Sequence, residues 1–167
     1  MGEKLKPEHR GRAAATPREL KLEEFFDGAL EAQGEFRDPF GRVRRTFNAT
    51  VTGTRSGDKI RVREKFRYND GETDEREWVI QALGRGRYRG EATDVVGTAE
   101  GQVEGACLRW SYPIDLLLGG RAWRLKFDDR FELNGADELI NTASVSKFGL
   151  PVGTVRQRIA RKGPFST

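Results

Sequence analysis

Three charged residues lie where a pattern of alternating residues calls for apolar side chains. Glu64 falls in step with Val62 and Phe66, and Arg45 and Asp129 stand in the same relation to their own neighbours. Successive side chains of a strand point to opposite faces, so all three charges are predicted on the apolar face. A charge in apolar surroundings is costly unless it is paired, which makes these residues the first candidates for chemistry.

Two kinds of chemistry fit this arrangement. Arg45 and Glu64 lie on segments predicted to be hairpin neighbours, so we expect an internal ion pair. Asp129 either joins this pair or stands alone. An arginine there can hold the carboxylate or phosphate of an elongated apolar ligand through two hydrogen bonds. Glu64 or Asp129, with a pKa raised by a dry interior, could instead act as a general acid or base. The structural alternative is a satisfied ion pair, or a bulge that turns the charge outward.

Aromatic residues share the phase of these charges. Those predicted to line a pocket with Arg45, Glu64 and Asp129 are Tyr68, Trp78, Tyr88, Trp110, Tyr112 and Phe127, and Trp123 falls on the same face. A filled core would use the same residues, and the spacing alone favours core packing over a pocket. The pair Asp128 and Asp129 lacks the further oxygen ligands that a hard cation needs, so we expect neither a metal site nor a cofactor.

Ten segments of alternating apolar and polar residues must position these side chains. Asp70-Gly71 and Asn134-Gly135 are strong hairpin signals, because both turn residues tolerate positive φ. Ten strands are too many for one open sheet, and closure removes exposed edges. We therefore predict an all-β, antiparallel up-and-down barrel, able to hold side chains or a small ligand. The predicted strands are 29–38, 43–54, 59–68, 72–83, 87–94, 97–104, 106–118, 122–133, 138–148 and 152–160.

The chain length fits one domain. We expect the 167 residues to divide into a mobile basic arm (1–17), a single barrel domain (18–162) and a short tail (163–167). Thr16 and Pro17 are typical of a helix start, with threonine as the cap, and Gly28 is predicted to end this short helix across one end of the sheet. The glycines between residues 90 and 105 are predicted to mark bulges or bends.

The net charge of +4 comes from the two ends of the chain. Residues 1–18 contain five basic residues against two acidic ones, and residues 156–162 contain four basic residues and no acid. Such ends either remain solvated or touch an anionic membrane peripherally, and no nucleic-acid recognition motif accompanies them. Cys107 is the only cysteine, which excludes an intramolecular disulfide. The sequence has no apolar run of membrane-spanning length.

Several glycine-containing and aromatic motifs together resemble a known family. They are Phe25-Phe26-Asp27-Gly28, Asp70-Gly71-Glu72, the stretch from Tyr88 to Gly101, Leu108-Arg109-Trp110, Phe127-Asp128-Asp129 and the stretch from Ile140 to Gly149. The combination is similar to the bacterial domain of unknown function 3833 over residues 20–161. This resemblance implies a barrel of the lipocalin or calycin type and an envelope or lipid-related role, with no catalytic residues to carry over.

The chain departs in two features from patterns that are known in similar barrel proteins. Members of that family are often described as lipoproteins, but this chain begins without an apolar signal or a nearby cysteine to take a lipid. We therefore expect a cytoplasmic protein as the chain stands, or an envelope-associated one if its native signal segment is missing. Fatty-acid-binding barrels present Arg-x-Tyr on their last strand, and here the last strand carries Arg156-Gln157-Arg158, a partial match.

The sequence favours a protein that binds a small apolar or amphipathic ligand, such as a fatty-acyl chain, inside the barrel. The first alternative is a barrel enzyme that uses an internal carboxylate for proton transfer. The second is a filled barrel with a structural or partner-binding role, whose basic ends make surface contacts.

Overall fold

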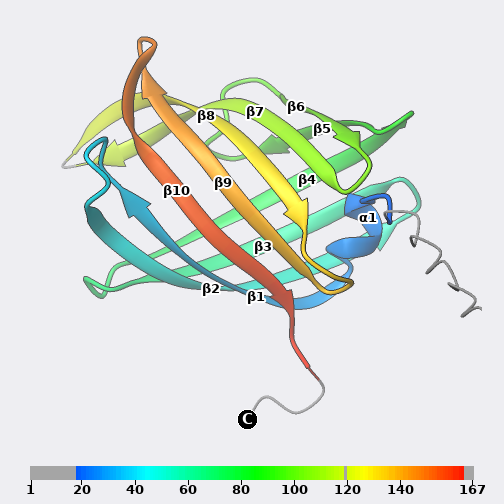
Figure 1. Cartoon of the computed structure of the whole chain (residues 1–167). Coiled ribbons are helices and arrows are strands. Elements are labelled where there is room, and N and C mark those ends of the chain that lie inside the picture. The colour runs from blue at the N-terminus through cyan, green and yellow to red at the C-terminus, as the bar shows by residue number, and fades with distance from the viewer. Residues whose placement is uncertain (1–17, 119, 164–167) are drawn as a thin grey trace, which may run out of the picture.

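The strands close into a barrel because each of them has one apolar and one polar face. The computed structural model describes residues 18–118 and 120–163. The barrel order is β1-β10-β9-β8-β7-β6-β5-β4-β3-β2 with antiparallel neighbours, which confirms the predicted up-and-down barrel (Figure 1). The elements are α1 (Leu22–Phe25), β1 (Gly28–Arg37), β2 (Val43–Ser56), β3 (Lys59–Tyr68), β4 (Thr73–Gly84), β5 (Arg87–Ala92), β6 (Ala99–Glu104), β7 (Cys107–Leu118), β8 (Arg121–Leu133), β9 (Glu138–Lys147) and β10 (Leu150–Arg161).

Closure joins the first strand to the last. β1 pairs with β10 from Leu30 opposite Arg161 to Arg37 opposite Thr154. Neither strand therefore keeps the row of unpaired N–H and C=O groups that an open sheet exposes. Alternate side chains along each strand point inward, where residues such as Leu30 are almost fully buried.

A short helix covers one end of the barrel (Figure 1). Leu22 and Phe25 of α1 are buried. A side-chain carbon at Gly53 of β2 would lie 1.6 Å from the Phe26 carbonyl oxygen, so glycine is what lets the end of the helix approach the barrel wall. The Nη2 of Arg161 donates to the carbonyl oxygen of Phe25 (3.0 Å), which gives a partner to a carbonyl at the end of the helix.

The helix begins later than the sequence predicts. Thr16 and Pro17 lie outside the described residues, and the first helical residue is Leu22. The residue before it is extended, with φ −122° and ψ 114°, and has no side-chain cap. The backbone N–H of Leu20 donates to the Gly105 carbonyl oxygen (2.8 Å), so this part of the chain is bound to the β6–β7 turn instead of to a helical turn. In the described ranges, no helix has the length and apolar character that crossing a membrane requires.

The link between β5 and β6 is longer than predicted and leaves the regular ladder. Within residues 93–98, Val95 forms an isolated bridge with Ile114 of β7. The Asp115 N–H donates to the Asp94 carbonyl oxygen (2.9 Å), so the link is held against the C-terminal half of β7. These two contacts fix the position of Asp94, which matters for the interior described below.

Of the glycines between residues 90 and 105 that were predicted to mark bulges or bends, Gly97 lies at a bend and none lies at a bulge. In the described strands the register shifts fall at residues 36–37, 82–84 and 151–153 instead. A side-chain carbon would lie 2.3 Å from the Trp110 ring at Gly101 and 2.6 Å from it at Gly90. Both glycines are therefore explained by packing, because they make room for the Trp110 indole on the inner face.

Candidate functional site

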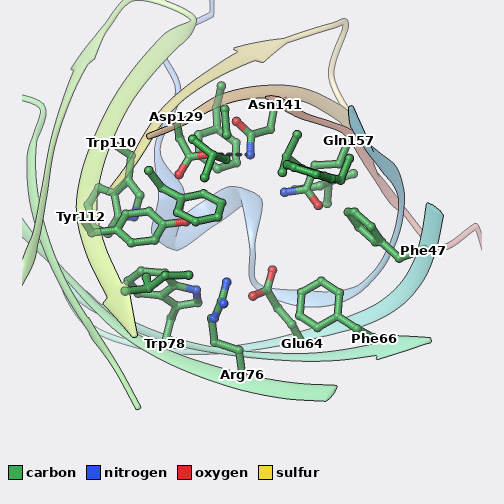
Figure 2. Close-up of a pocket in the computed structure, with 18 of the residues that line it drawn as sticks. Phe47, Glu64, Phe66, Arg76, Trp78, Trp110, Tyr112, Asp129, Asn141 and Gln157 are labelled. Carbon is green, nitrogen blue, oxygen red and sulfur yellow. Dashed lines mark hydrogen bonds between the residues drawn. The ribbon is translucent and has the colours of Figure 1, made fainter. Parts of the chain in front are cut away.

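A cavity of about 430 Å³ lies inside the barrel. Leu22 and Phe26 line it at the α1 end, and the half-buried Arg45 and Leu116 line it at the opposite end, which we call the mouth. A cavity of this size falls in the range that encloses a small organic molecule. The lining is mainly apolar and aromatic, and the rings of Phe47, Phe66, Trp78 and Trp110 are drawn in Figure 2.

Among the polar side chains that interrupt this apolar lining, we call five the polar cluster. They come from five strands and are Glu64 (β3), Arg76 (β4), Tyr112 (β7), Asp129 (β8) and Asn141 (β9). Glu64 and Arg76 are directly opposite each other in the β3–β4 ladder. Figure 2 shows these two on one wall and Asp129 with Asn141 on the facing wall, all directed into the cavity. The cluster therefore spans the interior.

Arg76 is already paired with a carboxylate. Its Nε lies 3.0 Å from Asp94 Oδ1 and its Nη2 lies 2.5 Å from Asp94 Oδ2, a two-pronged arrangement that suits the planar guanidinium. Burial alone would lower the pKa of Arg76, but Tyr112, Glu64 and Asp94 raise it, and the net shift is upward. Arg76 is therefore a fixed cation whose charge Asp94 balances.

Asp129 and Asn141 form the second half of the cluster. The Asn141 Nδ2 donates to Asp129 Oδ1 (3.0 Å), and both residues are buried. The Asn141 Oδ1 is also buried and has no hydrogen-bond partner in the described part of the chain. An unpaired buried acceptor costs free energy, so this atom is an open place for a hydrogen-bond donor.

Burial shifts both carboxyl groups of the cluster toward their protonated forms. It raises the pKa of Asp129 from 3.8 to about 6, against the opposing effects of Asn141, Tyr112 and Arg76. It also raises the pKa of Glu64, which the facing Arg76 offsets only in part. With a pKa of about 6, Asp129 can therefore change between accepting and donating a hydrogen bond slightly below neutral pH.

The predicted Arg45–Glu64 ion pair is wrong. Arg45 Nε lies 2.8 Å from Asp70 Oδ2 and its Nη2 lies 2.6 Å from Glu72 Oε2, while its guanidinium covers the Tyr68 ring at 3.5 Å. The reason is the hairpin register. Phe47 is opposite Tyr68, so Arg45, two residues before Phe47, falls beside the β3–β4 turn and not beside Glu64 in the middle of β3.

The structure brings eight of the nine predicted ligand-binding residues to one cavity. They are Arg45, Glu64, Tyr68, Trp78, Trp110, Tyr112, Phe127 and Asp129. Tyr88 is buried but lies beyond the lining, because its hydroxyl donates to Glu23 Oε2 (2.8 Å) and accepts from the Leu22 N–H (3.3 Å) under α1. Trp123, also predicted on the inner face, is exposed near the mouth, with Lys147 Nζ 3.7 Å from its ring centroid.

Sequence reasoning missed several polar residues of the cavity. Arg76 and Asp74 stand two and four residues before the inward Trp78, and Asn141 stands two residues before the buried Ala143. The same two-residue phase that singled out Glu64 would have found them. In the Arg156-Gln157-Arg158 segment of β10, only Gln157 lines the cavity. Neither arginine of the partial match to a fatty-acid anchor therefore faces the interior.

Asp128 and Asp129 lie on opposite faces of β8. Asp129 is buried in the cavity, while Asp128 is exposed and accepts a hydrogen bond from the Ser111 hydroxyl (2.7 Å). Among the described residues, no three His, Cys, Asp or Glu side chains are grouped closely enough to hold a metal ion.

These features define a class of protein: a closed, lipocalin-like antiparallel barrel with an internal cavity. The chain belongs to the family described as "Protein of unknown function (DUF3833)", whose model matches residues 6–161. The predicted family is thereby confirmed. No curated protein matches the chain.

Two solved structures are similar to this chain. The S-type phycobiliprotein lyase CPES from Guillardia theta is 11% identical, with a TM-score of 0.65 over 87% of this chain and 95% of that chain. A de novo designed fluorescence-activating β-barrel is 14% identical, with a TM-score of 0.47 over 86% of this chain and 99% of that chain. At such identities the likeness to the lyase concerns the fold alone.

Proposed function

We propose that this protein binds an elongated, amphipathic small molecule inside the barrel. The observation that carries the proposal is the cavity of about 430 Å³, apolar along most of its wall but crossed by one polar cluster. A folded chain that needed only stability would fill this volume, because empty space forfeits packing contacts. An apolar or lipid-like body is therefore the expected content of the cavity, with a polar group placed at the cluster.

The cluster favours a polar group that donates hydrogen bonds and carries no negative charge. The charge of Arg76 is balanced by Asp94, and Arg45 is engaged by Asp70 and Glu72, so neither arginine offers an unpaired cation to a ligand carboxylate. The available acceptor is the Asn141 Oδ1, beside Asp129. A hydroxyl, an amide or an amine would satisfy that acceptor, whereas a fatty-acid carboxylate would meet two carboxyl groups.

The proposal is tested by displacement of a fluorescent apolar probe, N-phenyl-1-naphthylamine, from the purified protein. We expect the probe to bind, and 1-dodecanol to displace it at about tenfold lower concentration than dodecanoate at pH 8, a difference of roughly 1.4 kcal/mol. Mass spectrometry of solvent extracts would identify any molecule that copurifies. Absence of probe binding together with an empty extract would overturn the proposal.

A matched pair of variants locates the polar contact. Asn141→Leu removes the open acceptor inside the cavity, so it should weaken 1-dodecanol about tenfold and leave a pure hydrocarbon such as dodecane unaffected. Asn48→Leu makes the same change at an exposed position of β2 and should alter neither affinity. Equal effects of the two variants would contradict binding at Asn141.

An enzyme is the second candidate, and the pKa of Asp129 favours it. A carboxyl group with a pKa of about 6 beside the Tyr112 hydroxyl is suited to proton transfer near neutral pH. Asp129→Asn would then retain ligand but stop its conversion. If the compounds extracted from this variant and from the unchanged protein differ as a substrate differs from its product, catalysis is supported. Identical compounds would support binding alone.

A further inference from the structure

Exposed apolar side chains gather at the mouth of the barrel. Six of the eight large apolar residues that are exposed in the described part of the chain lie on three hairpins at this end. We call these six the apolar rim: Phe40, Val43, Leu117, Trp123, Phe148 and Leu150. Phe148 is 91% exposed and Phe40 87%, and exposed apolar residues that gather at one place mark an interaction surface.

The rim occupies one continuous side of the mouth. Its hairpins are β1–β2, β9–β10 and β7–β8, and these six strands are consecutive in the barrel order. Figure 1 shows the three turns at the end opposite α1. On the other side of the mouth the β3–β4 turn carries Asp70 and Glu72, both held by Arg45. The rim hairpins carry acidic residues as well, but Asp38 and Asp115 are each paired with an arginine.

Phe148 occupies a turn position that is unfavourable for its own residue type. Lys147 pairs with Leu150, so Phe148 and Gly149 form a two-residue turn, with φ of 51° and 77°. Two positive φ values are typical of a type I′ hairpin, where asparagine followed by glycine is preferred. A bulky residue in this conformation is strained, and exposure returns no burial energy within the chain. This strain points to a partner outside the chain.

The charges around the rim complement an anionic surface. Arg42, Arg121 and Lys147 form no ion pair in the described residues, whereas the nearby Arg44 and Arg124 are neutralised by Asp38 and Asp115. Lys147 lies between the rings of Trp123 and Phe148, with its Nζ 3.7 Å and 5.4 Å from their centroids. Unpaired cations interspersed with exposed aromatic and aliphatic tips are the features that hold a protein at an anionic lipid interface.

We infer that the apolar rim docks this protein onto an anionic lipid bilayer, with the barrel mouth facing the membrane. The occupant is a bilayer because the apolar side chains stand on separate hairpin tips, each of which can enter the headgroup layer by itself. The inference goes beyond ligand binding and does not require it. Docking by the rim also differs from docking by the basic ends, since the two use different residues.

The test is cosedimentation with vesicles of phosphatidylcholine containing about 30% phosphatidylglycerol, an anionic lipid. The full chain should bind these vesicles and bind pure phosphatidylcholine about tenfold more weakly, with a further loss at high salt. Phe148→Asn should weaken binding about tenfold while the melting temperature stays the same or rises, because asparagine suits the turn. Leu83→Ser, an exposed apolar residue outside the rim, should bind like the unchanged protein.

Three other outcomes would overturn the inference. Unchanged vesicle binding by Phe148→Asn, together with its loss on deletion of residues 1–17, would assign docking to the basic arm. If the unchanged protein is a dimer, Phe148→Asn makes it a monomer, and neither form binds vesicles, the rim would be assigned to contact with a second copy of the chain. If the unchanged protein is a monomer and binds no vesicles, both a bilayer and a second copy would be excluded as partners of the rim. Binding of N-phenyl-1-naphthylamine is measured in parallel without lipid, so failure of the cavity and failure of the rim are distinguishable.

Discussion

Leu20 and Phe25 at the α1 end of the barrel are buried, whereas apolar side chains of the same kinds at the mouth are exposed. Leu20 and Phe25 pack against the α1 end of the barrel. The polar side chains beside them have hydrogen-bond partners, as the Tyr88–Glu23 hydrogen bond shows. Leu117 and Phe148 at the mouth have no such environment. The difference separates two roles, because burial at one end stabilises the fold while exposure at the other end leaves side chains available for a partner.

Arginines provide the largest expected contrast between the interior and the mouth. Arg76→Met leaves Asp94 and Glu64 without their compensating cation inside the barrel, and should lower the free energy of unfolding by about 4 kcal/mol. Arg45→Met breaks a partly exposed pair at the mouth and should cost about 1 kcal/mol or less. Urea unfolding of the two variants measures both changes. Equal losses would contradict the different burial of the two pairs.

Leucines test the same contrast for apolar side chains. Leu20→Ala should lower the free energy of unfolding by about 3 kcal/mol, because it leaves a void under the α1 end. Leu117→Ala removes the same atoms from an exposed tip and should change it by less than about 0.5 kcal/mol. Both values come from denaturant titration. A large cost at Leu117 would show that the mouth is packed against something in the folded chain.

Asp129→Asn should stabilise the protein in a pH-dependent way. The unfolded carboxyl ionises near pH 4 and the folded one near pH 6, so the stability present below pH 4 is lost as the pH rises to 6 and stays lost above it. Asparagine carries no such penalty, and we expect a gain of about 3 kcal/mol at pH 8 that disappears by about pH 4. Thermal unfolding across this range measures the gain, and a gain independent of pH would contradict the raised pKa.

Tyrosines give the smallest contrast. Tyr88→Phe loses the hydrogen bonds to Glu23 and to the Leu22 N–H, and should cost about 1 kcal/mol. Tyr68→Phe at the mouth keeps the ring beneath Arg45 and should cost less than about 0.5 kcal/mol. Chemical denaturation can resolve this difference. Equal costs would show that the Tyr88 hydroxyl contributes little to holding α1.

Period-two alternation predicted the strands well because it follows from strand geometry alone. The third strand, 59–68, has the predicted bounds, and the inward phase of Trp78 and Asp129 is also observed. The helix start failed because a local signal at Thr16 and Pro17 says nothing about the contact of Leu20 with a distant turn. The Arg45–Glu64 pair failed because hairpin neighbours share a register, and only residues at matching distances from the turn meet.

The sequence by itself determined the ten strands, their inward faces and the closure of the sheet, since these depend on alternation and on turns between adjacent segments. Only the tertiary structure decided that the interior is hollow, because the inward direction of a side chain does not say how much volume its neighbours fill. It also decided that Arg76 pairs with Asp94 and that Asn141 keeps an open acceptor. These relations join residues on different strands, and their geometry is set by closure, not by any local pattern.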